Sequence, residues 1–240
     1  MRFRLHIIPS IVILLLAVTS FTKVGLVNAE HLYSVIDTIN FTNPSPSGVT
    51  INSVNDRAYV TLFDSSSISV INGETDKITD TIPIPNSTNP DDIDFNMGNG
   101  VGYLYVIDKS SSPDTLKVVN TSTKQVVATI PVGTNGNDVA VNHANAKVYV
   151  TSDDGTTGTP DKVYVIDGTS NRVITTIPVG SAPLGVAVNS VNGRVYIANF
   201  ESNTVSVIDG ELNFYTIYQK VQRLQLQVHF LQPTHYFQEE

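Results

Sequence analysis

Short runs of β-branched and aromatic residues alternate with polar turns along most of this chain. Each run holds four to seven residues rich in Val, Ile, Thr and Tyr, bounded by Gly, Asn, Asp or Pro, as in Arg194–Asn199. This composition and length are typical of β-strands, and the apolar positions do not recur at the spacing of a helix. The pattern therefore predicts short antiparallel strands joined by turns.

The runs belong to a unit that recurs with a period of about 45 residues. Four runs per unit describe one four-stranded antiparallel blade, and such blades stack radially into a β-propeller. Small residues such as Ala187 in the first run suit an inner strand near a crowded axis. Proline follows the fourth run and lacks the N–H that a central strand needs, so this run is expected at the outer edge. Fourth runs end at Ile39, Ile82, Ile130 and Ile177.

The second run of each unit centres on a tyrosine. It reads Tyr59-Val60-Thr61, Tyr149-Val150-Thr151 and Tyr196-Ile197-Ala198-Asn199 in three units, accompanied by VID or VIN and TIPVG runs. From about Leu32 to Asp209 the chain resembles the YVTN family of WD40-like β-propeller repeats, found in surface-layer-like proteins of prokaryotes. The second unit departs most, because Gly102–Val106 keeps the tyrosine but loses the end of the motif. The resemblance implies a propeller outside the cytoplasm and no single activity.

The expected fold is all-β, a β-propeller of about four four-stranded antiparallel blades over residues 30–212. Propellers have four to eight blades, and YVTN proteins commonly resemble the seven-bladed form, so four blades either close alone or leave an open arc. For closure, Ser34–Ile39 has the sequence of an outer strand and would pair beside Thr204–Asp209. An open arc would expose unpaired strands and favour self-association through the open blade edges.

Residues 1–29 have the pattern of a signal peptide. Arg2 and Arg4 precede an apolar stretch that is densest over Ile11–Val18, and small residues allow cleavage after Ala29. The stretch is short for a membrane span. The alternative is an uncleaved N-terminal membrane anchor, because Phe21–Val27 extends the apolar stretch. Both alternatives predict an extracellular or cell-surface protein.

The repeats stop abruptly, and residues 213–240 form a tail of different composition. After Asn213 the tail lacks Gly, Asn, Asp, Ser and Ala but holds six Gln. The sequence also lacks the outer strand expected after Asp209. We expect a repeat array cut short and followed by an unrelated tail, either disordered or produced by a shifted reading frame. The alternative is a genuine C-terminal docking segment.

Charge and composition narrow the choice of partners. The formal net charge is −8, with 22 acidic and 14 basic residues and no basic cluster. An acidic chain of this kind argues against nucleic acid and anionic membrane surfaces as partners. The absence of cysteine excludes disulfides, cysteine metal sites and a thiol nucleophile. Proteins or glycans at the cell surface are the expected partners.

Acidic residues provide one candidate metal site, and no other cofactor is expected. Carboxylates and carbonyl oxygens in loops can bind Ca²⁺, and the candidates are Asp153, Asp154 and Asp161. A second acidic cluster contains Asp91, Asp92 and Asp94, of which strand alternation directs the last two to one face. Neither cluster has the spacing of an EF-hand, and solvated acidic loops are the alternative.

Glycosylation offers a second kind of candidate site. Asn-x-Ser/Thr sequons begin at Asn40, Asn86 and Asn120, in expected turns or strand ends where an exported chain could carry a glycan. The alternative is chance occurrence in a chain rich in Asn, Ser and Thr.

Other conspicuous side chains have structural explanations. Tyrosines at one register of the unit are expected to pack between blades rather than to bind a ligand; they are Tyr59, Tyr105, Tyr149, Tyr164 and Tyr196. His143 lies in a tight turn and is expected to be solvated. The sequence contains no phosphate-binding glycine loop, zinc-ligand spacing or nucleophile elbow.

The expected function is that of a non-catalytic, exported structural or binding module. The turns form a tight set and a longer, variable set, and the rim with the longer loops is the better candidate for binding a protein or glycan. The alternative is an enzyme, because related-looking propellers include lactone-hydrolysing and redox-associated members. An enzyme would need ionisable groups that converge at the central channel, and the acids of the inner strands are Asp92, Asp94 and Asp138. The fold alone does not decide between these functions.

Overall fold

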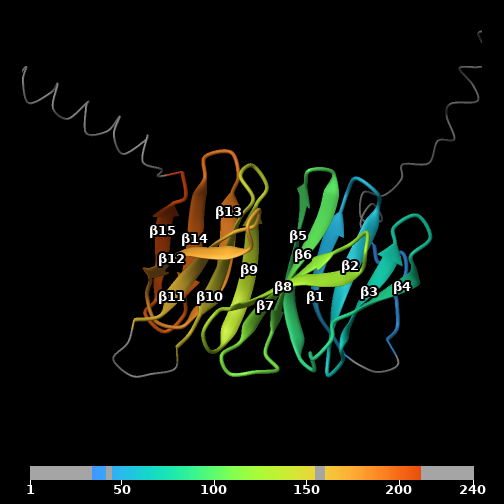
Figure 1. Ribbon diagram of the computed structural model, residues 1–240, viewed down its shortest axis with the longest axis horizontal. Coiled ribbons are helices and arrows are strands. Elements are labelled where there is room, and N and C mark those ends of the chain that lie inside the picture. The colour runs from blue at the N-terminus through green and yellow to red at the C-terminus, as the bar shows by residue number, and fades with distance from the viewer. Residues whose placement is uncertain (1–33, 42–44, 155–159, 212–240) are drawn as a thin grey trace, which may run out of the picture. The chain divides into compact units, whose positions relative to one another are not determined.

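A computed structural model of the 240-residue chain describes residues 34–41, 45–154 and 160–211 (Figure 1). The expected signal segment and the whole tail, residues 213–240, lie outside these residues. The chain divides into two compact units, Met1–Thr38 and Ile39–Glu240. Residues 34–38 of the first unit are exposed and adopt no regular secondary structure. In the part of the chain that the structure describes, no helix reaches the length and hydrophobicity that crossing a membrane requires.

The second unit contains four antiparallel sheets, each built from consecutive strands. We call each sheet a blade. The first contains β1 (Ser45–Asn52), β2 (Arg57–Phe63), β3 (Ser67–Asn72) and β4 (Lys77–Pro83), coloured blue to teal in Figure 1. The second contains β5 (Pro90–Gly98), β6 (Val101–Asp108), β7 (Thr115–Asn120) and β8 (Gln125–Pro131). The third contains β9 (Gly136–Asn142), β10 (Lys147–Ser152), β11 (Lys162–Asp167) and β12 (Arg172–Pro178), and the fourth contains β13 (Pro183–Asn189), β14 (Arg194–Asn199) and β15 (Thr204–Asp209).

The recurring Asn and Asp residues at strand ends form the tight turns. The Oδ1 atom of Asn72, at the end of β3, accepts the N–H groups of Glu74 and Thr75, each at 3.0 Å. Asp56 and Asn171 adopt φ values of 51° and 56°, in the left-handed region that Asn and Asp tolerate. The turn chemistry predicted from the sequence is therefore confirmed.

Inner and outer strands occupy the expected places. Contacts between neighbouring blades join their first strands, β1 with β5, β5 with β9 and β9 with β13. The strands that end at Pro83, Pro131 and Pro178 lie at the opposite edge of their sheets, next to only one other strand. Because the prolines lie on edge strands, their missing N–H groups do not interrupt the hydrogen bonds between central strands.

The hydrophobic core lies between the blades. We call the side of a blade that packs against the following blade its trailing face, and the other side its leading face. Between the first two blades, Tyr59 stacks on Phe95 with ring centroids 6.2 Å apart and planes at 11°. The trailing face of the first blade presents Tyr59, Ile68, Val70, Ile82 and Ile84, and the leading face of the second presents Ile93, Phe95, Leu104, Val106 and Val119.

The two sets of turns lie on opposite rims. On the rim of longer loops, the N–H of Ile84 donates to the carbonyl of Ser66 at 2.7 Å. On the rim of tight turns, the N–H of Gly168 donates to the carbonyl of Ala146 at 2.9 Å. We call these the long-loop rim and the tight-turn rim, and their predicted separation is confirmed.

Of the two alternatives, closure and an open arc, the structure has the open arc. The expected pairing of Ser34–Ile39 with Thr204–Asp209 is wrong for the single chain, because Ser34–Asn40 contains no strand and β15 pairs only with β14 among the described residues. Strand pairing and the contacts between first strands join each blade to its sequence neighbours and do not join the fourth blade to the first. Ile39 and Phe41 pack against the first blade, on a cluster of Val60, Leu62 and Ile71.

Candidate functional site

The inner strands carry a row of three carboxylates. Asp92 and Asp94 alternate along β5, and Asp138 lies on β9. Each accepts a backbone N–H from the inner strand of the following blade, so the shared face expected for Asp92 and Asp94 is confirmed. The bonds run from Val139 to Asp92 at 2.9 Å, from Val141 to Asp94 at 2.8 Å and from Val186 to Asp138 at 2.7 Å.

These bonds give the carboxylates a structural role. An inner strand is the edge of its own sheet, so part of its backbone N–H groups has no partner within the blade. The carboxylate of the preceding blade supplies that partner, and bonds from N–H to an ionised acceptor are stronger than neutral ones. The row therefore fastens each inner strand to the next.

Burial changes the acidity of this row. Desolvation, and then a hydrogen bond with Asp138, raise the pKa of Asp92 to about 7. Burial also raises the pKa of Asp94, while the N–H groups of Phe95 and Val141 act in the opposite direction. Raised pKa values of Asp92 and Asp94 in a buried row are a property of acid–base sites as well as of structural networks.

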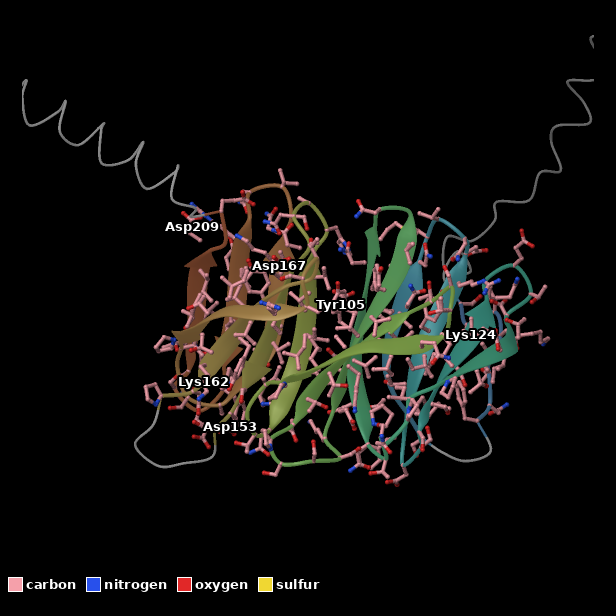
Figure 2. All side chains as sticks on the ribbon, in the orientation of Figure 1. Tyr105, Lys124, Asp153, Lys162, Asp167 and Asp209 are labelled. Carbon is pink, nitrogen blue, oxygen red and sulfur yellow. The ribbon has the colours of Figure 1, made fainter. Side chains whose placement is uncertain are left out.

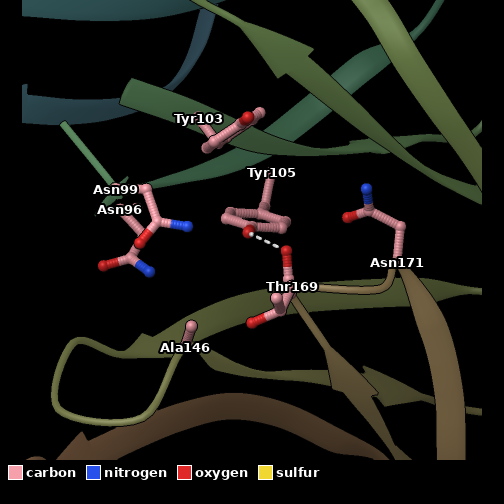
Figure 3. Close-up of a pocket in the computed structure, with 9 residues that line it drawn as sticks. Asn96, Asn99, Tyr103, Tyr105, Ala146, Thr169 and Asn171 are labelled. Carbon is pink, nitrogen blue, oxygen red and sulfur yellow. Dashed lines mark hydrogen bonds between the residues drawn. The ribbon is translucent and has the colours of Figure 1, made fainter. Parts of the chain in front are cut away.

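A small polar pocket lies at the tight-turn rim between the second and third blades (Figure 3). Its volume is about 100 Å³, below the roughly 300 Å³ of small-molecule sites. The Tyr105 hydroxyl donates to the carbonyl of Gly168 at 3.4 Å, and burial raises the pKa of Tyr105 to about 12. The tyrosine therefore remains a protonated donor. The other labelled lining residues are Asn96, Asn99, Tyr103, Ala146, Thr169 and Asn171.

His143 borders the row of acids from the tight-turn rim. It is exposed, as the sequence predicts, and its Nδ1 lies 3.2 Å from Oδ1 of Asn96 on the preceding blade. The ring therefore bridges two blades at the surface.

The long-loop rim exposes apolar side chains. Phe63 and Leu184 are about half exposed, and Phe200 is 70% exposed. The backbone of Phe200 is held in place, because its N–H donates to the carbonyl of Ala182 at 2.8 Å. Figure 2 labels two polar residues of the same rim, Asp153 and Lys162. The rim thus combines fixed backbone, exposed aromatic rings and charges.

Known proteins match the chain in two ways. The NHL repeat model matches residues 181–208, which cover most of the fourth blade. No curated protein matches the chain. The solved structure of the Dos1 propeller has a TM-score of 0.57 at 13% identity, over 69% of this chain and 45% of its own. The WD40 β-propeller domain of Doa1 has a TM-score of 0.53 at 13% identity, over 68% of this chain and 50% of its own.

The fold is an open β-propeller. The chain spans about half the length of the two solved propellers, and identities this low support the fold alone. The NHL match supports propeller repeats in general. Membership of the YVTN family and a surface-layer role stay predictions.

The tyrosines predicted to pack between propeller blades do so where a following blade exists. Tyr59, Tyr105 and Tyr149, on the second strands of their blades, are almost fully buried. Tyr164 is not at this register: it lies on β11 and is half-buried on the leading face of the third blade, against the core between the second and third blades. Tyr196 belongs to the fourth blade and is 36% exposed. Position in the array therefore decides burial at this register.

The calcium candidates have other partners in the described structure. The Oδ1 and Oδ2 atoms of Asp161 accept the N–H groups of Asp154 at 3.0 Å and Ala182 at 2.8 Å. Asp154 pairs with the Lys162 ammonium at 3.2 Å. Outside residues 155–159 and the other undescribed segments, no three Asp, Glu or His side chains gather closely enough to hold a metal. The calcium site, with Asp153 as its third candidate, stays a prediction.

The three sequons differ in accessibility. Asn40 and Asn86 are exposed, and Asn86 adopts a φ of 59° in a turn. Asn120 is half-buried, and its Oδ1 accepts the N–H groups of Ser122 and Thr123 at 2.9 and 3.0 Å. Glycosylation of all three stays a prediction, and Asn120 would have to leave its turn bonds to be modified.

Sequence analysis missed a buried ion pair in the second blade. Lys117 Nζ lies 3.5 Å from Asp108 Oδ2, and both residues are buried. The Ser87 hydroxyl donates to Asp108 Oδ1 at 2.9 Å. The repeat itself contains the signal, because Asp108 stands where the first unit has Leu62 and Lys117 interrupts an apolar run.

Proposed function

We propose that this chain is an exported, non-catalytic propeller that binds a protein partner through its long-loop rim. The observation that carries the proposal is the exposure of Phe63, Leu184 and Phe200 on that rim. Aromatic side chains, Phe among them, are enriched in the buried cores of protein–protein interfaces. A fixed backbone beneath them lowers the ordering cost of binding.

The row of inner-strand acids supports a non-catalytic role. Each of the three carboxylates accepts a backbone N–H from a neighbouring blade. Groups committed to blade packing are poorly placed to release and take up protons during turnover. The small pocket at the opposite rim is also below the size of a typical substrate site.

Rim binding is testable by capture from the envelope fraction of the source cells. The full chain serves as bait, followed by cross-linking and mass spectrometry. We expect Phe200→Asp to lose the captured protein at least tenfold, because a charge replaces an aromatic anchor. Val191→Asp is the matched control, since Val191 is 98% exposed on the tight-turn rim. Equal capture by both variants would contradict rim binding. If capture is lost only when the envelope fraction is treated with glycosidase, the partner is a glycan.

Export is supported by the charged start and the apolar stretch of residues 1–29 and by the small residues before Glu30. Expression of the full gene in the source cells, followed by N-terminal sequencing, tests it. A mature chain that begins at Glu30 in the medium or envelope is the expected result. A cytoplasmic chain that begins at Met1 would be incompatible with export.

One observation favours the alternative function of an enzyme. Burial, with Asp138 as a neighbour, raises the pKa of Asp92 to about 7, which is the range suited to a general acid or base at neutral pH. Turnover of a panel of lactones by the full chain, abolished by Asp92→Asn, would favour this alternative. If the folded protein turns over none of the lactones, the result supports the binding module.

A further inference from the structure

The segment before the first blade has the sequence of an outer strand. Asp37-Thr38-Ile39 corresponds to Asp80-Thr81-Ile82 of β4, and Phe41 corresponds to Ile84. In each complete blade these two apolar positions reach the following blade. They are Ile82 and Ile84, Ile130 and Val132, and Ile177 and Val179.

Ile39 and Phe41 make the same contact with the first blade. They pack against Ala58, Val60 and Ile71 on its leading face. The equivalent side chains of the second blade, Leu104, Val106 and Val119, pack with Ile82 and Ile84. Ile39 and Phe41 therefore occupy the place that the outer strand of a preceding blade would take. The described residues around them do not include the other three strands of such a blade.

The fourth blade has the complementary deficiency. It has three strands, and β15 pairs with β14 alone among the described residues. Its trailing face is exposed, with Val205 at 61% and Val207 at 58%, whereas Leu116 and Val118 at the same register of the second blade are fully buried. Within the part of the chain that the structure describes, the fourth blade therefore has neither an outer strand nor a following leading face.

We propose that a second copy of this chain supplies both. Its Ser34–Ile39 segment pairs with β15 and completes the fourth blade, and the leading face of its first blade covers Tyr196, Val205 and Val207. The reciprocal contact closes a ring of two copies and eight blades, within the four to eight blades of known propellers. An added strand on an exposed sheet edge is an established mode of association.

The repeat predicts the register of the new pairing. In β3 and β4, Ile68 faces Ile82 and Ser69 faces Thr81. The β7–β8 pair repeats this arrangement, with Leu116 opposite Ile130 and Lys117 opposite Thr129. By the same offset, Val205 faces Ile39 and Ser206 faces Thr38 of the other copy.

A second copy fits better than intramolecular closure. Among the described residues, Ser34–Asn40 is not a strand, and neither strand pairing nor contact between first strands joins the fourth blade to the first, so these residues do not meet the two deficiencies within one chain. The exposed trailing face of the fourth blade resembles the trailing faces of the first three blades. Each of those three is covered by the leading face of the following blade. The new contact therefore repeats an interface that the sequence already encodes.

Light scattering after size exclusion of the full chain tests the association. We expect a single species of twice the 26.0 kDa chain mass. Replacing both Val205 and Val207 by Lys should halve that mass without loss of the β-sheet circular dichroism signal, because both residues are exposed in one chain. Val191→Lys, on an exposed turn, should leave the mass unchanged. A monomeric wild type, or a ladder of larger species, would overturn the two-copy ring.

Cysteine cross-linking tests the register, since the chain has no cysteine. A Thr38→Cys chain mixed with a Ser206→Cys chain should form a disulfide-linked pair under mild oxidation. A Thr38→Cys chain mixed with a Val191→Cys chain should not. If a chain that carries both Thr38→Cys and Ser206→Cys forms the bond only within itself, the strand closes its own chain and the proposal is wrong.

Discussion

The Oδ2 atom of Asp92 on β5 accepts the N–H of Val139 on β9 at 2.9 Å, across the boundary between the second and third blades. This carboxyl is largely buried, and burial together with the neighbouring Asp138 raises its pKa to about 7. An acid with a raised pKa therefore lies at the contact that joins two blades.

The raised pKa of Asp92 makes the stability of the propeller depend on pH. The pKa of Asp92 is about 7 in the folded protein, against 3.8 for a free side chain. The folded state thus holds the proton more tightly, and the free energy of unfolding falls as the pH rises from about 4 to about 7. The contribution of protonated Asp92 to stability is complete below about pH 4 and lost above about pH 7. Between these values the free energy of unfolding falls by no more than about 1.4 kcal/mol per pH unit.

Asp92→Asn should remove this dependence. The amide can accept the N–H of Val139 and donate to Asp138 without titrating. Urea unfolding at pH 5, 6, 7 and 8 should show the variant gaining stability relative to the wild type as the pH rises. Asp64→Asn, at an exposed carboxylate in the β2–β3 loop, is the control and should follow the wild-type curve. Parallel curves for Asp92→Asn and the wild type would contradict the raised pKa of Asp92.

The buried tyrosines allow a matched test of hydrogen bonding between blades. The Tyr105 hydroxyl donates to Gly168 of the following blade, whereas the buried Tyr149 hydroxyl has no hydrogen-bond partner among the described residues. Replacing Tyr105 by Phe should cost about 1 kcal/mol in the free energy of unfolding, and replacing Tyr149 by Phe should cost less. Denaturant titration of both variants provides the measurement. An equal loss in the free energy of unfolding at the two positions would mean that the hydrogen bond from Tyr105 to Gly168 does not stabilise the fold.

Much of this architecture could be predicted because it is local. Alternating apolar residues, Asn and Asp at strand ends and Pro after outer strands each act within a few residues, so strands, turns and strand order follow from the sequence. The same alternation places Asp92 and Asp94 on one face. That Asp138 meets Asp92 depends on the stagger between blades, which no local pattern encodes.

The position of Ser34–Ile39 illustrates a second limit. The sequence identifies an outer strand but not the surface that receives it. Ile39 and Phe41 contact the first blade, where their apolar side chains find Val60 and Leu62 directly after a short connection. Pairing with β15 would require the first and fourth blades of one chain to meet, and their positions are set by all the interfaces between them.

The ion pair in the second blade should be strongly coupled. Lys117→Met leaves the Asp108 carboxylate buried without its cation, which should cost about 3–5 kcal/mol in the free energy of unfolding. The fourth blade offers a neutral replacement, since Asn199 and Ser206 occupy the same positions and their side chains are 2.9 Å apart. Asp108→Asn combined with Lys117→Ser should therefore recover most of the loss in thermal or urea unfolding. A double variant as unstable as Lys117→Met would show that the charges themselves stabilise the blade.

Docking of Phe41 on the first blade predicts a stabilising role for a segment outside the sheets. Its ring is half-buried against Val60, Leu62 and Ile71, so truncation removes apolar contact without opening a fully enclosed cavity. Phe41→Ala should therefore cost about 2 kcal/mol in urea unfolding, less than a fully buried aromatic ring. Ile36→Ala, at an exposed position, should stay within about 0.5 kcal/mol of the wild type. If both variants unfold like the wild type, the segment does not cover the leading face in solution.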